Sequence, residues 1–273
     1  MFRASAIFTN YFSPLNAALG FMESGFVKTF KYAILCLLLA GCQSSIEQYD
    51  SHGNPNFNAL YESAQSNRQA QSDLVELVLK EPSLVNSFTY FIAAKYAISL
   101  GKIEDAGFLF FAGQARGKLE LYMHPAPSVD VGSALGALKQ TIGSVVNPAI
   151  MQPVIYSNIV KRLNSWEVIP DPSYEFPWDT TNNNKTATEV GEKSVEIKSS
   201  MFAYMKPMAE LLDIPDYYQA FQTIQDYNLK LSYKQRSEPE FLDKLNEAKK
   251  VIVGIEKSKG YDIFKSRFDK TQP

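Results

Sequence analysis

Apolar residues recur at intervals of three and four along most of the chain from residue 59 to residue 268, which is the pattern of helices that bury one face. Within this range, no run of alternating apolar and polar residues is long enough to build a sheet. The pattern therefore predicts an all-α fold, a single multi-helix domain over residues 59–268. The predicted helices are residues 73–80, 84–99, 103–122, 131–146 and 154–166, then 187–206, and two more that begin at Pro215 and Pro239.

The expected ends of these helices depend on glycines, prolines and capping side chains. Ser72 is the expected cap of the first helix, and Gly101 is the expected left-handed residue after the second. Proline removes a backbone donor, so Pro148 is expected to stop one helix and Pro207 to kink or restart another. The last helix is expected to begin with a capping box over residues 237–240.

The helix expected over residues 103–122 is apolar on nearly all sides, which is typical of a helix at the centre of a core. It contains three internal glycines, each of which costs about 1 kcal/mol relative to alanine in a helix. These are Gly107, Gly113 and Gly117. We expect a neighbouring backbone to approach closely at these glycines.

This helix also carries a possible polar cluster, formed by Glu104, Gln114, Arg116 and Glu120 with His124 at its end. Glu120 follows Arg116 by one turn, a spacing that permits an intrahelical ion pair. Alternatively, Arg116 and Gln114 together form a site that binds an anionic ligand. Glu104 is a candidate general acid or base, or it simply complements the helix dipole. His124 is a candidate catalytic base, or it interacts with the carbonyl groups at a helix C-terminus.

A long connection over residues 168–186 is rich in proline and asparagine and is not expected to be helical. Its aromatic residues are candidates for contact with a protein partner, because tyrosine and tryptophan are enriched at binding hot spots. They are Tyr174, Phe176 and Trp178. Packing of this loop on its own domain is the alternative.

The segment AAKYAISLGKIEDAGFLFFAGQAR, residues 93–116, resembles one helical hairpin of the tetratricopeptide or Sel1 type in its small residues, its turn glycine and Phe110. No second copy occurs at the period of ~34–40 residues of such repeats, and about three copies are needed to bury their faces. We therefore expect a general αα-hairpin here and assign the body to no repeat family.

The composition excludes several classes of partner and cofactor. The formal net charge is −2, which argues against a nucleic-acid partner. The chain has two cysteines and two histidines, so we expect no metal site of the usual zinc or copper type, and no phosphate-loop or dinucleotide motif indicates a cofactor. The methionines at 201, 205 and 208 have the spacing of a core stripe.

Residues 28–42 stand apart from the rest of the chain. Two lysines, Lys28 and Lys31, accompany an apolar run over residues 30–39, and the run ends in Leu39-Ala40-Gly41-Cys42. This segment resembles a bacterial lipoprotein signal peptide, and its last four residues match the lipobox at every position. The apolar run is too short for a transmembrane helix, which needs about 20 residues. An ordinary secreted protein with a free Cys42 thiol is the other alternative.

The resemblance implies that residues up to Gly41 are removed. Residues 1–21 have no leader features, and a leader that starts at Met22 would have ordinary length, so Met22 is a candidate translation start. Cys42 would carry a thioether-linked diacylglycerol, and its amine a further chain such as palmitate. Gln43, rather than aspartate, would direct the protein to the outer membrane, facing the periplasm. Residues 42–58 would form a flexible tether, and no cysteine would remain to form a disulfide in the body.

These features together predict a membrane-anchored periplasmic lipoprotein that binds a protein partner without catalysis. An immunity protein against a secreted antibacterial toxin is a specific version of this function. Two alternatives are an envelope enzyme acting on cell wall or lipid, with Glu104, Arg116 and His124 brought together, and a scaffold subunit of an envelope complex.

Overall fold

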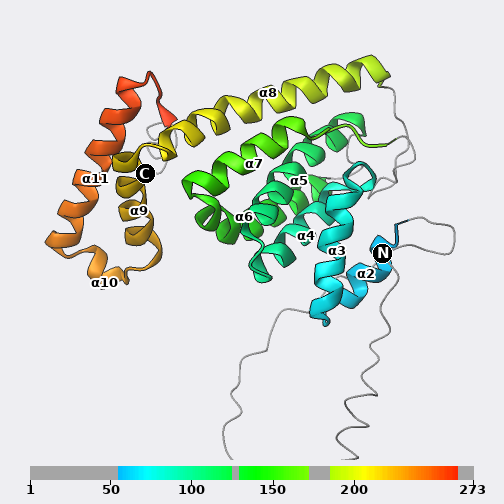
Figure 1. Ribbon diagram of the computed structural model, residues 1–273, viewed down its shortest axis with the longest axis horizontal. Coiled ribbons are helices and arrows are strands. Elements are labelled where there is room, and N and C mark those ends of the chain that lie inside the picture. The colour runs from blue at the N-terminus through cyan, green and yellow to red at the C-terminus, as the bar shows by residue number, and fades with distance from the viewer. Residues whose placement is uncertain (1–54, 125–128, 172–184, 264–273) are drawn as a thin grey trace, which may run out of the picture. The chain divides into compact units, whose positions relative to one another are not determined.

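The computed structural model describes residues 55–124, 129–171 and 185–263 (Figure 1). These residues form helices and contain no strand, which confirms the all-α prediction. The helices are α2 (Phe57–Ala64), α3 (Arg68–Lys80), α4 (Ser87–Ser99), α5 (Ile103–Met123), α6 (Val129–Ile150), α7 (Pro153–Ser165), α8 (Ala187–Leu212), α9 (Pro215–Leu229), α10 (Tyr233–Arg236) and α11 (Pro239–Ser258), with a 3-10 turn, η1 (Pro82–Leu84). None of the helices in these ranges combines the length and apolarity that crossing a bilayer requires.

Helix α5 lies at the centre, as its sequence predicted, because α4, α6, α7 and α8 all pack against it (Figure 1). Its glycines mark the closest of these contacts. A Cβ atom at Gly107 would lie 2.3 Å from Ile159 Cδ1 of α7, and one at Gly113 would lie 3.0 Å from Tyr90 Cβ of α4. Glycine is therefore required by the packing. The groups that approach most closely are side chains, whereas we had expected backbone.

The turn before α5 follows the predicted hairpin. Gly101 has a φ of 78°, in the left-handed region where glycine is favoured, so α4 ends there and α5 begins two residues later. The start of α3 differs from the prediction, because the Asn67 side chain accepts a hydrogen bond from the Gln69 amide at 2.8 Å. Asn67 rather than Ser72 is the cap, and Ser72 lies inside the helix.

The two prolines expected to interrupt helices do not do so. Pro148 lies inside α6 and Pro207 inside α8. Ile150, beyond the first proline, and Leu211, beyond the second, are both fully buried. Burying one such side chain stabilises a fold by about 1.5–3 kcal/mol, which is comparable with the cost of about 3 kcal/mol of an internal proline. Packing thus holds the helices together across both prolines.

The α9 and α11 helices form a second hairpin, which packs on the C-terminal part of α8. Tyr217 and Glu256 are buried between these two helices, and the tyrosine hydroxyl donates to the carboxylate at 2.9 Å. The capping box predicted at residues 237–240 is wrong, because the α11 cap makes no side-chain bond; the box forms instead between Ser232 and Gln235, at the start of α10. Helix α8 contacts α5 and α7 as well as α9, so one helix connects the second hairpin to the central helices.

We expect Gly107→Ala to destabilise the protein by about 1–3 kcal/mol, because the added methyl group would displace Ile159 and Ile150, which are both fully buried. Gly191→Ala is the matched control. Gly191 lies inside α8 with no atom within 4 Å of the new methyl, so the better helix propensity of alanine should stabilise the fold by up to about 1 kcal/mol. Urea unfolding measures both changes. Equal effects of the two substitutions would contradict the close packing at Gly107.

Candidate functional site

Arg116 is fully buried on α5 and holds the turn before α4. Its Nη1 donates to the carbonyl oxygen of Val85 at 3.0 Å, and its Nη2 to that of Pro82 at 3.3 Å. The guanidinium carbon lies 5.8 Å from the ring centroids of both Tyr90 and Trp166. These contacts compensate the loss of water around the charge, and they enclose it on several sides. The arginine thus has a structural role, and it does not line the groove described below.

Glu120 lies one turn after Arg116 and is equally buried. Its carboxylate accepts from the backbone amide of Ser87 at 3.0 Å and also from the Ser87 hydroxyl. Ser87 is the first residue of α4, where the helix dipole favours a negative charge. Burial in this region raises the pKa of Tyr90 to about 12, so its hydroxyl remains protonated and donates to the Pro82 carbonyl. Arg116 and Glu120 together fix the start of α4.

The other charged candidates lie elsewhere. Glu104 accepts a hydrogen bond from Asn158 of α7 at 3.0 Å. His124 directly follows α5, and burial lowers the pKa of its imidazole, which favours the neutral form. Glu104 and His124 are separated by about 30 Å along the helix axis, at 1.5 Å per residue. The structure therefore does not bring Glu104, Arg116 and His124 to one cleft, and the enzyme hypothesis loses the three residues on which it was based.

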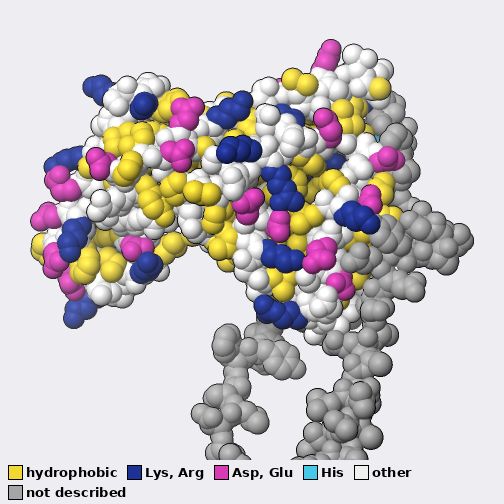
Figure 2. Space-filling view, in the orientation of Figure 1, with side chains coloured by type: hydrophobic (Ala, Val, Ile, Leu, Met, Phe, Trp, Pro, Cys, Tyr) yellow, Lys and Arg dark blue, Asp and Glu magenta, His cyan; other side chains and the backbone are white. Residues whose placement is uncertain are grey.

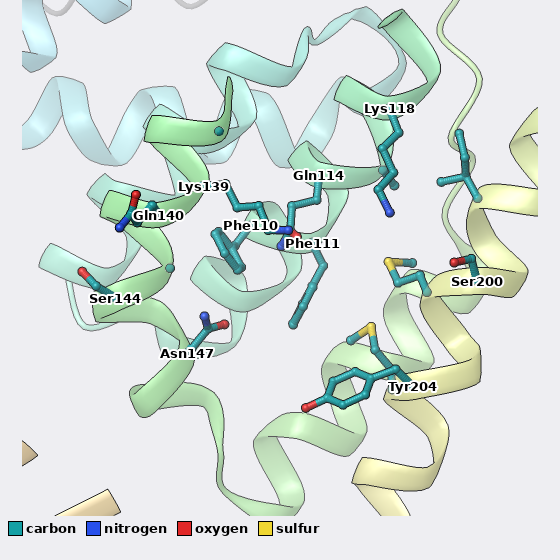
Figure 3. A pocket seen from close by; sticks show the side chains of 16 residues that line it. Phe110, Phe111, Gln114, Lys118, Lys139, Gln140, Ser144, Asn147, Ser200 and Tyr204 are labelled. Carbon is teal, nitrogen blue, oxygen red and sulfur yellow. The ribbon is translucent and has the colours of Figure 1, made fainter. Parts of the chain in front are cut away.

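Gln114, the remaining member of the expected polar cluster, lines a groove between α5, α6 and α8 (Figure 3). The groove has a volume of about 520 Å³. Its lining combines aromatic, sulfur-containing and aliphatic side chains with amide, hydroxyl and ammonium groups. They are Phe110, Phe111, Gln114, Ala115 and Lys118 of α5; Gly136, Lys139, Gln140, Gly143, Ser144 and Asn147 of α6; and Ile197, Ser200, Met201, Tyr204 and Met205 of α8.

Small residues on α6 shape this groove. A Cβ atom at Gly143 would lie 2.8 Å from the tip of the Phe110 ring, so glycine lets the ring reach α6. A Cβ atom at Gly136 would meet nothing within 4 Å, which leaves that wall open. The hydroxyls of Ser144 and Ser200 add little bulk. The space between the three helices stays unfilled because these positions carry small residues.

The groove carries charge of one sign. Lys118 and Lys139 line it, and no aspartate or glutamate of the described residues does. Figure 3 shows the two lysine side chains reaching from α5 and α6 toward the space beside Gln114 and Phe111. Elsewhere the two signs mix: on the face drawn in Figure 2, acidic and basic side chains are interspersed. A positive groove on a chain with a net charge of −2 is therefore a local feature of the fold.

Several predicted site residues lie outside the described residues, namely Cys42, Tyr174, Phe176 and Trp178. In the described part of the chain, no group of three or more His, Cys, Asp or Glu side chains is placed to hold a metal ion. No family model, curated protein or solved structure matches this chain. The function is therefore argued from the groove and the sequence.

We expect Arg116→Met to destabilise the fold by about 3 kcal/mol or more, because it removes the donors to the turn before α4 and leaves the buried Glu120 without a positive charge one turn away. Urea unfolding measures this loss. Lys244→Met is the control; its ion pair with Glu240 is exposed, and we expect little change. An Arg116→Met protein as stable as the wild type would contradict the structural role.

Proposed function

We propose that this chain is a lipid-anchored protein of the bacterial cell envelope that binds another protein and does not catalyse a reaction. The observation that carries the proposal is the groove between α5, α6 and α8. Its aromatic rings and methionines offer apolar contact area, and its amides and ammonium groups offer hydrogen bonds. The lining residues in the described part of the chain include no histidine, cysteine or carboxylate, and their chemistry suits recognition.

The shape of the groove supports a polypeptide as the bound molecule. Its residues on α6 run from Gly136 to Asn147, about 17 Å along the helix axis. Two or three turns of a partner helix have a similar length, and helices commonly bind in apolar grooves between other helices. Met201 of α8 is partly exposed and lines one wall beside the buried Met205, and a flexible methionine side chain adapts to the surface of a partner.

The lipobox at residues 39–42 supports the proposed location. A diacylglycerol on Cys42 supplies two chains, which is enough for a stable anchor at about 0.8 kcal/mol per buried methylene. Phe57 and Asn58 belong to α2, so the proposed tether is limited to residues 42–56. As a flexible chain it would span on the order of 20 Å, so the groove would search a thin layer beside the bilayer. Gln43 favours the outer membrane, on its periplasmic side.

An immunity protein is the version of this function that we favour for a first genetic test. Such a protein neutralises a toxin delivered into the periplasm by binding it. A toxin-like reading frame directly upstream would support this version, and expressing that toxin in the periplasm with and without this protein would measure rescue. A neighbouring cell-wall or transport operon would rule out the immunity-protein version of the function.

A scaffold subunit is the second candidate, favoured by the surface of the second hairpin. Tyr233, in α10, is 91% exposed, and Leu229, at the end of α9, is 59% exposed. Exposed aromatic and aliphatic side chains are common in protein interfaces. A scaffold would use this hairpin and the groove for different partners, and it should co-purify with both in detergent.

We expect Cys42→Ser to release the protein from the membrane fraction, because serine lacks the thiol that the lipid modifies. Cys36→Ser is the control, since Cys36 lies in the segment that we expect to be removed, and its membrane association should be unchanged. Mass spectrometry of the N-terminal peptide gives the direct readout. An unmodified Cys42 thiol in the wild-type protein would contradict the proposed anchor.

Filling the groove should strongly weaken binding of the protein partner. We expect a photo-crosslinking residue at the exposed Gln140 to capture a protease-sensitive partner in living cells, and the same residue at Lys249 of α11 to capture none. Adding Gly136→Trp should lower the yield about tenfold or more, which corresponds to at least 1.4 kcal/mol of lost affinity.

Gly132→Trp is the matched control for the filled groove. Gly132 lies one turn earlier on α6 with equally open surroundings, but it does not line the groove. Its crosslinking yield should stay within about twofold of the wild type, since an interface residue that contacts no partner contributes little. Loss of the crosslink in both tryptophan variants would mean that the effect lies outside the groove.

A further inference from the structure

The two lysines of the groove set the chemistry of its occupant. Lys118 and Lys139 are exposed, come from different helices and line the same space (Figure 3). Neither forms an ion pair with another of the described residues within 4 Å. Two like charges beside one apolar surface repel each other, and an anion placed between them removes that repulsion. The complementary ligand group is thus a carboxylate or a phosphate.

A second, smaller pocket adjoins the groove at the lysines. It shares Gln114, Lys118, Gly136 and Lys139 with the groove, and its remaining walls include Phe91, Leu121 and Leu135. Its volume is about 120 Å³. Ligand pockets usually begin near 300 Å³, so this one suits a single apolar side chain. The smaller pocket and the two lysines therefore lie where one ligand could place an apolar group beside an anion.

The openness of the groove favours a polypeptide over a small amphiphile. Along α6, its lining residues Lys139, Gln140, Ser144 and Asn147 are all exposed. A small ligand here would stay largely in water, whereas small-molecule sites bury about 70–90% of their ligands. A segment of a folded partner does not have this problem, because its remaining surface is covered by the partner itself.

The distribution of charged residues around the groove also favours an acidic ligand. Residues 131–166, which include most of α6 and all of α7, contain no aspartate or glutamate. Lys193 of α8, whose ammonium lies 5.5 Å from the Tyr122 ring one turn beyond Lys118, is already paired with Glu196. Among the described residues, Lys118 and Lys139 are the charged side chains that line the groove, and both remain for a ligand. An acidic partner would be attracted here and a basic one repelled.

We propose that the groove recognises an acidic amphipathic segment of its protein partner. A carboxylate of this segment lies between Lys118 and Lys139, an adjacent apolar side chain enters the smaller pocket, and further apolar side chains lie on Phe111 and Met201. This inference rests on the proposed protein-binding function and specifies the chemistry of the partner.

Charge reversal in the full-length protein in cells tests it. With the crosslinking residue at Gln140, we expect Lys118→Glu with Lys139→Glu to lower the yield of the protein adduct about tenfold or more, because each glutamate repels the acidic segment. Lys118→Arg with Lys139→Arg should retain the yield within about twofold. Both lysines are exposed and outside ion pairs, so thermal unfolding of the reversed protein should match the wild type.

Lys249→Glu with Lys257→Glu is the control. Both residues are exposed on α11, and the pair changes the net charge by the same amount away from the groove, so the yield should be unchanged. An undiminished adduct in the Lys118/Lys139 reversal would overturn the acidic segment and leave the proposed function standing. A protease-resistant lipid adduct at Gln140, or no adduct in the wild type, would overturn both.

Discussion

Two buried charges on the central helix α5 fix the turn before α4 and the start of α4 against it. Arg116 donates to carbonyls of the turn before α4, and Glu120 accepts from Ser87, the first residue of α4. A charge removed from water is tolerated only where such partners are fixed in place, and one side of α5 supplies both charges within a single turn. The remaining surface of α5 is therefore free to pack against apolar helices and to form the floor of the groove.

Much of the fold was predictable, because it depends on local pattern. The apolar period predicted α3 to α9 and α11, although it missed the short helices α2 and α10. Gly101 marked the αα-turn, because glycine favours the left-handed backbone found there. The ends of α6 and α8 were not predictable in this way. Pro148 and Pro207 lower helix stability locally, while Ile150 and Leu211 restore it by contacts with residues distant in sequence. Tertiary burial outweighed the local preference.

The groove was much less predictable than the helices. Gln114 was identified, but only as part of a cluster with Glu104 and His124 that one straight helix holds far apart. Lys118 and Lys139 were not identified from the sequence, because they line the same groove only once α5 and α6 are packed. The sequence feature that could have pointed to the groove was the absence of acidic residues over 131–166. It indicates that this region favours an acidic ligand, but it does not give the location of the binding site.

The continuity of α8 through Pro207 has a mechanical consequence. Met201 and Met205 line the groove, while Leu211 and Leu212, further along the same helix, are buried in the core near the second hairpin. A helix transmits displacement along its axis more readily than a loop does. Because no loop interrupts α8 between them, displacement of Met201 by a molecule in the groove would be transmitted along one helix toward the contact between α8 and α9.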